Sequence, residues 1–159
     1  KKKFIIGEKF LYLGKECELK IIPANKNAIQ YFDNNFLLSE NCIEYAEQYF
    51  IALYKNLAWN YLANKTVELA KKYNFNVTNI KINSAKTKWG SCSSKNGIIY
   101  SWNLIMAPSE VIDYVIVHEL CHTIHKNHSK DFWELVSQIT PKYKEYILFL
   151  KNNGHLFNI

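Results

Sequence analysis

The chain has 159 residues, of which 48% are hydrophobic and 21% are charged, and this balance excludes a fibre or a disordered tail. A chain of this length buries roughly two-thirds of the surface that its unfolded form exposes, so a core forms without disulfides. The four cysteines include no C-x-x-C pair, which excludes a cysteine zinc knuckle and is not typical of a secreted disulfide framework. We therefore expect a cytoplasmic protein.

The net charge of +6 arises from 20 lysines and no arginine against 14 acidic residues. Such an excess suits an anionic partner such as nucleic acid. Arginine, however, is the residue that binds phosphate and guanine through two parallel hydrogen bonds, so its absence disfavours a protein that reads bases. The longest apolar run, residues 49–54, is far shorter than the roughly 20 residues that span a bilayer.

Residues 1–40 predict a strand-rich meander. Short apolar segments alternate there with Asn and Gly turns, and connections of this length carry no crossover helix, so we expect antiparallel pairing throughout. The expected strands cover residues 9–13, 17–22, 28–32 and 36–38.

The apolar pattern changes to a helical period near residue 41. Asn41 and Glu44 form a capping pattern ahead of apolar residues spaced three and four apart. The pattern predicts a long helix, or a helix pair, over residues 41–74, which the polar stretch 64–66 would split. Its aromatic side chains at helical spacing favour core positions over a stacking platform for nucleic acid.

Residues 77–154 predict a hairpin followed by helices. The expected strands cover 77–82, 87–92 and 98–101, and residues 103–107 could extend the last one. The expected helices run from Ser109 to about residue 127, from a cap at Ser129, and from Pro141 to Gly154. Together these elements predict a single α+β domain over residues 1–159.

Four of the five histidines lie within eleven residues, and this cluster is the main functional signal. The segment from His118 to His122 reads H-E-x-x-H inside a predicted helix, where residues four apart share one face. For this composition the expected number of such matches by chance is roughly 0.01. The neighbouring residues are apolar, so the histidines and Glu119 need buried partners. The sequence therefore predicts zinc on His118 and His122, with Glu119 beside a zinc-bound water.

A catalytic zinc site commonly takes three protein ligands, and we choose His128 as the third. It follows the expected end of the helix, so the chain can turn back there. His125 lies about 10.5 Å from His118 along the helix axis, too far to share one metal, and we expect it in the last helical turn. If the third ligand is instead a carboxylate from a later helix, the candidates are Glu134 and Glu145.

The spacing of the three histidines equals that of the metzincins, but their Gly is His125 here and no Met follows the site. The wider segment gives a better match. W-G-S-C at 89–92, H-E-L-x-H at 118–122 and N-H-S-x-x-F-W at 127–133 occur in this order. Over about residues 80 to 150 the chain resembles the YgjP-like zinc metallopeptidase domains, which are relatives of the SprT/Spartan group. Lys88 stands where members of that family often carry Arg.

The resemblance implies a zincin-like fold, zinc on His118, His122 and His128, and Glu119 as the catalytic base. We expect an antiparallel sheet packed on the zinc-bearing helix, with a long helix in the N-terminal half. The expected reaction is peptide-bond cleavage by Glu-assisted attack of zinc-bound water. Two alternatives stay open: a zinc amidohydrolase acting on a non-peptide amide, and a non-catalytic zinc-containing domain that binds protein or nucleic acid.

The expected partner is a peptide or protein substrate, with nucleic acid as the weaker alternative and no membrane partner. The exposed edge of the 87–101 hairpin could hold an extended peptide by strand addition. Either Tyr143 or His125 could donate a hydrogen bond to the developing oxyanion, and the sequence does not select between them. We expect packing roles for Trp89, Trp133, Cys92 and Cys121.

Overall fold

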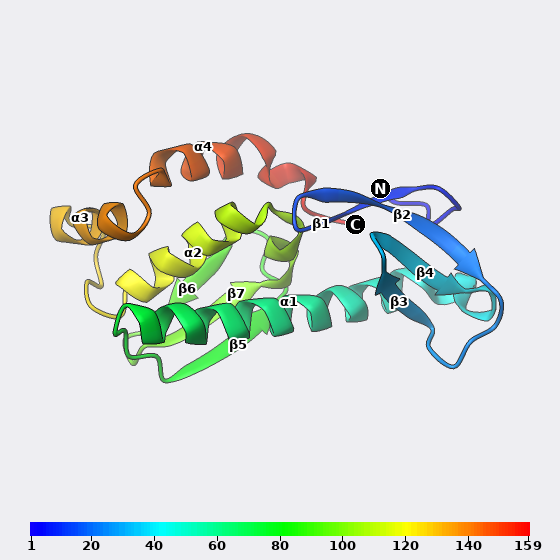
Figure 1. Cartoon of the computed structure of the whole chain (residues 1–159), viewed down its shortest axis with the longest axis horizontal. Helices are drawn as coiled ribbons and strands as arrows, with labels where there is room; N and C mark the ends of the chain where they lie inside the picture. Colours follow the sequence, from blue (N-terminus) through cyan, green and yellow to red (C-terminus); the bar gives the residue numbers. More distant parts are fainter.

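Residues 9–39 form a four-stranded sheet at one end of the molecule in the computed structural model, which describes residues 1–159 (Figure 1). The strands are β1 (Lys9–Tyr12), β2 (Lys15–Ile22), β3 (Ile29–Phe32) and β4 (Asn35–Ser39), in the order β1-β2-β4-β3. They lie close to the predicted ranges. The predicted antiparallel meander is wrong, because β2 and β4 pair in parallel.

Burial explains why β4 and not β3 lies beside β2. Phe36 and Leu38 of β4 are fully buried, whereas no residue of β3 is. The apolar β4 therefore takes the central position and β3 takes the edge. The tight turn at Asp33 and Asn34, both with positive φ, reverses the chain between the two strands.

One helix connects this sheet to the rest of the molecule (Figure 1). A 3₁₀ segment, η1 (Glu40–Tyr45), leads into α1 (Ala46–Lys72), which is 27 residues long and unbroken at residues 64–66. Thr66 is buried there, and its hydroxyl hydrogen-bonds that of Tyr100 at 2.9 Å. Phe50 and Tyr54 lie in the core as expected, whereas Trp59 is 45% exposed.

The second sheet contains β5 (Asn79–Asn83), β6 (Gly90–Cys92) and β7 (Gly97–Ser101), in the order β5-β7-β6. The β6–β7 hairpin agrees with the prediction. The most buried strand, β7, is central, and β5 pairs with it in parallel, so this sheet also departs from the antiparallel expectation. Residues 102–106 form the 3₁₀ segment η2 (Trp102–Met106) and do not extend β7.

Three helices complete the chain: α2 (Ser109–Cys121), α3 (Lys130–Ile139) and α4 (Tyr143–Asn153), followed by η3 (Gly154–Leu156). α2 contacts α1, β6 and α4, so it lies in the interior of the α+β fold. It ends at Cys121, several residues before the predicted end. Side-chain bonds to the backbone end it: the Thr123 hydroxyl donates to the Leu120 carbonyl at 2.6 Å, and the His122 Nδ1 atom donates to the His125 carbonyl at 2.9 Å. No helix is both long and apolar enough to cross a bilayer.

Candidate metal centre

Three imidazoles converge at the C-terminal end of α2. The Nε2 atom of His128 lies 3.0 Å from that of His122 and 3.3 Å from that of His118. Two nitrogen ligands of a tetrahedral zinc, each about 2.0–2.1 Å from the metal, are about 3.3 Å apart. The three side chains therefore have the spacing and the donor atoms that a tetrahedral metal site requires.

Two of the imidazoles are held by hydrogen bonds through their other nitrogen. The His122 Nδ1 atom faces the His125 carbonyl, which can only accept, so the Nδ1 atom carries the hydrogen and Nε2 keeps a free lone pair. The His118 Nδ1 atom lies 3.2 Å from the Tyr114 hydroxyl, which can accept in the same way. Such outer contacts fix the ring orientation of metal-binding histidines.

His128 is held by aromatic rings. The Trp133 ring stacks on it at 5.8 Å between centroids, with 23° between the planes. The fully buried Phe132 ring lies 4.4 to 5.0 Å from all three imidazoles, again measured between centroids. The Ser129 hydroxyl caps α3 by accepting from the Phe132 N–H, as the sequence predicts. The cap therefore fixes the start of α3 directly after His128.

Burial keeps two of the metal-free histidines, His118 and His122, neutral. It lowers the pKa of His118 to about 3, and the neighbouring imidazoles of His122 and His128 act in the same direction. Burial also lowers the pKa of His122, against the effect of the His125 carbonyl. Only a neutral imidazole has the lone pair that binds a metal, so these two side chains are ready to bind without first losing a proton near neutral pH.

Glu119 is 4% exposed and lies beside the histidine cluster, against β6. A Cβ atom added at Gly90 would lie 3.1 Å from both Cγ and Oε2 of Glu119, so only glycine leaves the carboxyl group its full space. Burial raises the pKa of Glu119 to about 8, and the charge of Lys88 opposes this shift. A carboxyl group with a raised pKa can accept and release a proton near neutral pH.

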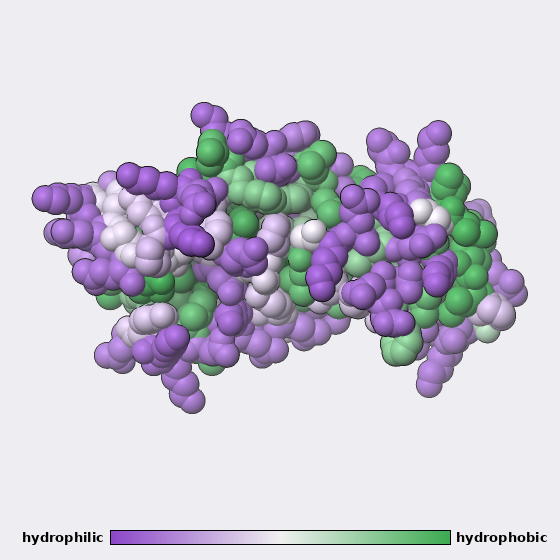
Figure 2. Space-filling view, turned by 45° about the horizontal axis from the view of Figure 1, so that its top comes forward, coloured by the Kyte–Doolittle hydropathy of each residue, from purple (hydrophilic) through white to green (hydrophobic).

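A cavity of about 310 Å³ opens next to Glu119 and His118. Its walls come from α2, α4 and the loop before β6, and they are largely apolar. α4 also carries exposed apolar side chains, including Leu148, which is 56% exposed. Figure 2 shows apolar surface in the middle of the molecule, over α4, with hydrophilic surface on either side.

The other candidates from the sequence lie elsewhere. Glu134 and Glu145 are exposed and do not belong to the three-histidine group. His125 lies beyond the end of α2 and not in its last turn, and its carbonyl binds His122. The sequence interpretation missed Tyr114 and Gly90. The spacing of Tyr114, one helical turn before His118, was an available signal, whereas nothing local marks the contact between Gly90 and Glu119.

Comparisons with known proteins agree with this fold. The fold is similar to the crystal structure of the metallopeptidase zymogen of Pyrococcus abyssi abylysin, with a TM-score of 0.50 and 19% sequence identity. The match covers 57% of this chain and 93% of that one. No curated protein matches the chain. The α+β, zincin-like fold class is therefore confirmed.

The family assignment rests on a larger part of the chain. The family model described as "YgjP-like, metallopeptidase domain" matches residues 1–153. The matched range contains both sheets, α1 and the complete histidine cluster. The chain therefore belongs to the YgjP-like metallopeptidase family.

Proposed function

We propose that this metallopeptidase is a zinc enzyme in which His118, His122 and His128 hold the metal and Glu119 is the general base. The observation that carries the proposal is the convergence of three Nε2 atoms, two of the pairs 3.0 and 3.3 Å apart, beside a buried carboxyl group. Three imidazole nitrogen donors in tetrahedral spacing suit zinc and leave a fourth position open.

A zinc ion held there would polarise the peptide carbonyl and lower the pKa of water toward about 7. Glu119 accepts a proton at a carboxylate oxygen as the water oxygen forms its bond to the carbonyl carbon. It then passes the proton to the amide nitrogen as the carbon–nitrogen bond breaks, so the amine leaves neutral. The low exposure of Glu119 keeps bulk water from competing for this proton.

The strand arrangement supports a peptide substrate. β6 is an edge strand, and Gly90 at its start touches Glu119. An extended peptide that paired with this edge would run past the base. Tyr143 and His125 both stay candidates for donating to the oxyanion. The Tyr143 ring stacks on Trp133 at 5.2 Å between centroids, and Trp133 also stacks on His128.

The test combines metal content with turnover. We expect close to one zinc per chain in the wild type and in Glu119→Gln, and none in His122→Ala. We expect Glu119→Gln to lose at least 100-fold in kcat on a peptide substrate, because general-base catalysis contributes roughly 10²- to 10⁴-fold. If Glu119→Gln turns over substrate as fast as the wild type, Glu119 is not the base. If His128→Ala keeps full zinc occupancy, His128 is not the third ligand.

A further inference from the structure

Three cavities surround the loop that joins β5 to β6, residues 84–89. The first is the cavity of about 310 Å³ beside Glu119, and the others measure about 390 and 240 Å³. Neighbouring cavities share lining residues: Trp89 lies between the first and second, and Lys88 between the first and third. We call these three neighbouring cavities together the loop cleft, and Glu119 lines the first of them.

The loop follows a fixed path along one wall of the cleft. The hydroxyl of Ser101, a buried residue of β7, donates to the Ala85 carbonyl at 2.8 Å. The Ser101 N–H donates to the Trp89 carbonyl at 2.9 Å. Both ends of the loop are thus attached to the central strand, which defines where Lys86 and Lys88 stand.

The C-terminal segment lines the second cavity. The Asn103 side chain donates to the Phe157 carbonyl at 2.7 Å, and the Phe157 ring packs edge-on against Trp89 at 5.7 Å between centroids. A Cβ atom at Gly154 would lie 2.8 Å from the Trp89 ring. Trp89, the last residue of the loop, therefore packs against the C-terminal segment, and the cleft has a shape before any ligand binds.

The charge of the loop cleft is one-sided. Lys86, Lys88 and His155 line it, and Glu119 is the one acidic residue that does. Neither Lys86 nor Lys88 takes part in an ion pair, because the three ion pairs of the protein involve Lys9 and Lys65. The two loop lysines are thus free to meet an anionic ligand.

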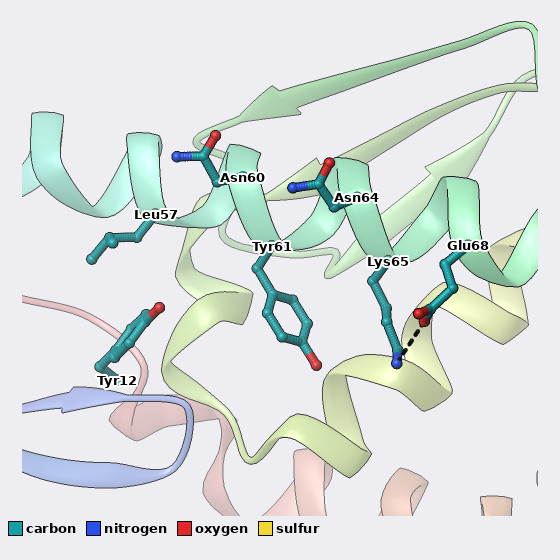
Figure 3. Close-up of a pocket in the computed structure, with 7 residues that line it drawn as sticks. All are labelled: Tyr12, Leu57, Asn60, Tyr61, Asn64, Lys65 and Glu68. Atoms are coloured by element: carbon teal, nitrogen blue, oxygen red, sulfur yellow. Dashed lines mark ion pairs between the residues drawn. The ribbon is translucent and has the colours of Figure 1, made fainter.

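A cavity below α1 shows the opposite arrangement (Figure 3). It measures about 400 Å³, and Tyr61 and Lys65 point into the same space as Tyr12. Lys65 pairs there with Glu68 at 2.9 Å and approaches Asp113 at 3.9 Å, and the Tyr61 hydroxyl donates to Asp113. Because these charges satisfy one another, this cavity does not select for an anion.

The inner part of the loop cleft is apolar. Val115, Ile147 and Leu150 line the cavity beside Glu119 together with Trp89 and Tyr114. Burying a large aliphatic or aromatic side chain stabilises a complex strongly. An exposed ion pair contributes much less. The apolar part would therefore supply most of the affinity and the lysines most of the selection among ligands.

We infer that the loop cleft binds a peptide in which a large apolar residue next to the scissile bond is flanked by acidic residues. The inference rests on the proposed function, since it places the apolar side chain beside Glu119. The apolar residue of the substrate fills the inner cavity while neighbouring carboxylates approach Lys86 and Lys88. A peptide flanked by lysines meets like charges in the same place.

The test measures binding to zinc-loaded Glu119→Gln, so that no turnover disturbs it. Four fluorescently labelled peptides of equal length carry a central Leu with Asp, Asn or Lys flanks, or a central Ala with Asp flanks. We expect the Asp–Leu peptide to bind about 3- to 10-fold more tightly than the Asn–Leu peptide. The Lys–Leu and Asp–Ala peptides should bind more weakly than the Asp–Leu peptide, and the charge preference should shrink at high salt.

Charge reversal gives a result that misfolding cannot imitate. In the Glu119→Gln background, Lys86→Glu combined with Lys88→Glu should reverse the preference toward the Lys–Leu peptide. The matched control is Lys20→Glu with Lys26→Glu, which makes the same change in net charge at exposed positions in or next to the N-terminal sheet. The control should keep the preference for Asp flanks.

Several results would overturn the inference. These are equal binding of the Asp and Asn peptides, an unchanged preference after reversal at 86 and 88, or tighter binding of a single-stranded oligonucleotide than of any peptide. Cleavage by the wild type separates this inference from the proposed function. Peptides that bind with the stated preference but are never cleaved would reject the function alone, whereas cleavage without any charge preference would reject the cleft assignment alone.

Discussion

Gly90 brings the backbone of β6 against the carboxyl group of Glu119. The Cβ atom of an alanine there would lie 3.1 Å from Oε2, closer than about nine in ten Cβ contacts in proteins. Either the strand or the carboxyl group must shift by a few tenths of an ångström. A base placed for proton transfer tolerates little displacement, so the absence of a side chain at residue 90 is a requirement of the proposed chemistry.

We predict that Gly90→Ala lowers kcat by roughly 10- to 100-fold while zinc content stays near that of the wild type. The loss should appear in kcat more than in KM, because the added Cβ atom contacts the side chain of Glu119. Steady-state kinetics and metal analysis on the same preparation check this. Gly97→Ala is not a matched control, since its Cβ atom would clash with the Asn79 side chain; Ser91→Ala, on the same strand as Gly90, is the better one. Full activity in Gly90→Ala would contradict the placement of Glu119.

Glu119 also affects the stability of the metal-free protein. Burial raises the pKa of Glu119 from its ordinary value of 4.5 to about 8 in the folded chain. A raised pKa means that the folded state holds a proton that the unfolded state has lost, so stability falls as pH rises from about 5 to 8. Glutamine carries no such proton.

In chelator we therefore expect the free energy of unfolding of Glu119→Gln to exceed that of the wild type by an amount that grows with pH. The growth from pH 5 to pH 8 should be roughly 2–4 kcal/mol. Urea unfolding at both pH values measures it, with Glu134→Gln as the control at an exposed position. A difference independent of pH would show that the carboxyl group is not buried as described.

At the scale of elements, the site depends on how α2 ends and α3 begins. α2 supplies His118 and His122, and the chain then turns so that His128 directly precedes the cap of α3 at Ser129. The cap accepts one hydrogen bond from the Phe132 N–H at 3.3 Å. The position of the third imidazole is thus tied to a single helix start.

We predict that Ser129→Ala weakens zinc binding by about 3- to 10-fold, since losing such a cap costs about 1 kcal/mol. Competition with a chromophoric chelator gives the affinity without reference to activity. Ser129→Asp should restore the affinity, because an aspartate caps equally well. Ser137→Ala serves as the control: its hydroxyl donates back to the Glu134 carbonyl of the same helix and caps nothing. If Ser129→Ala binds zinc as tightly as the wild type, the position of His128 does not depend on this cap.

The parts that the sequence predicted are those that depend on neighbours along the chain. The four-residue spacing of His118 and His122 and the cap at Ser129 are local features, so their patterns are readable. The parallel pairing of β2 with β4 could not be read from the sequence, because the choice of partner strand depends on burial across the whole sheet. The early end of α2 was missed because hydrogen bonds from Thr123 and His122 to backbone carbonyls ended it against its helical pattern.

At the scale of the molecule, we propose that the chain is one cooperative domain. α1 runs from the N-terminal sheet to the second one (Figure 1), and one buried cluster includes residues of both sheets. The β1–β2 turn docks on η2: the Leu13 N–H donates to the Ile105 carbonyl at 2.9 Å, and the Gly14 N–H to the Met106 carbonyl at 3.0 Å. The Tyr54 hydroxyl, from α1, donates to the Leu11 carbonyl at 2.6 Å.

Gly14 is the residue where this coupling is most sensitive. Its φ is +78°, and a Cβ atom would lie 2.8 Å from the Cα atom of Pro108. We predict that Gly14→Ala lowers the free energy of unfolding by roughly 2–3 kcal/mol, from strain and overpacking together. If the chain unfolds as one unit, hydrogen exchange in β1 and β2 and tryptophan fluorescence must shift together, because all four tryptophans lie outside the N-terminal sheet. An N-terminal sheet that opens first, with the fluorescence transition unmoved, would show two independent units joined by α1.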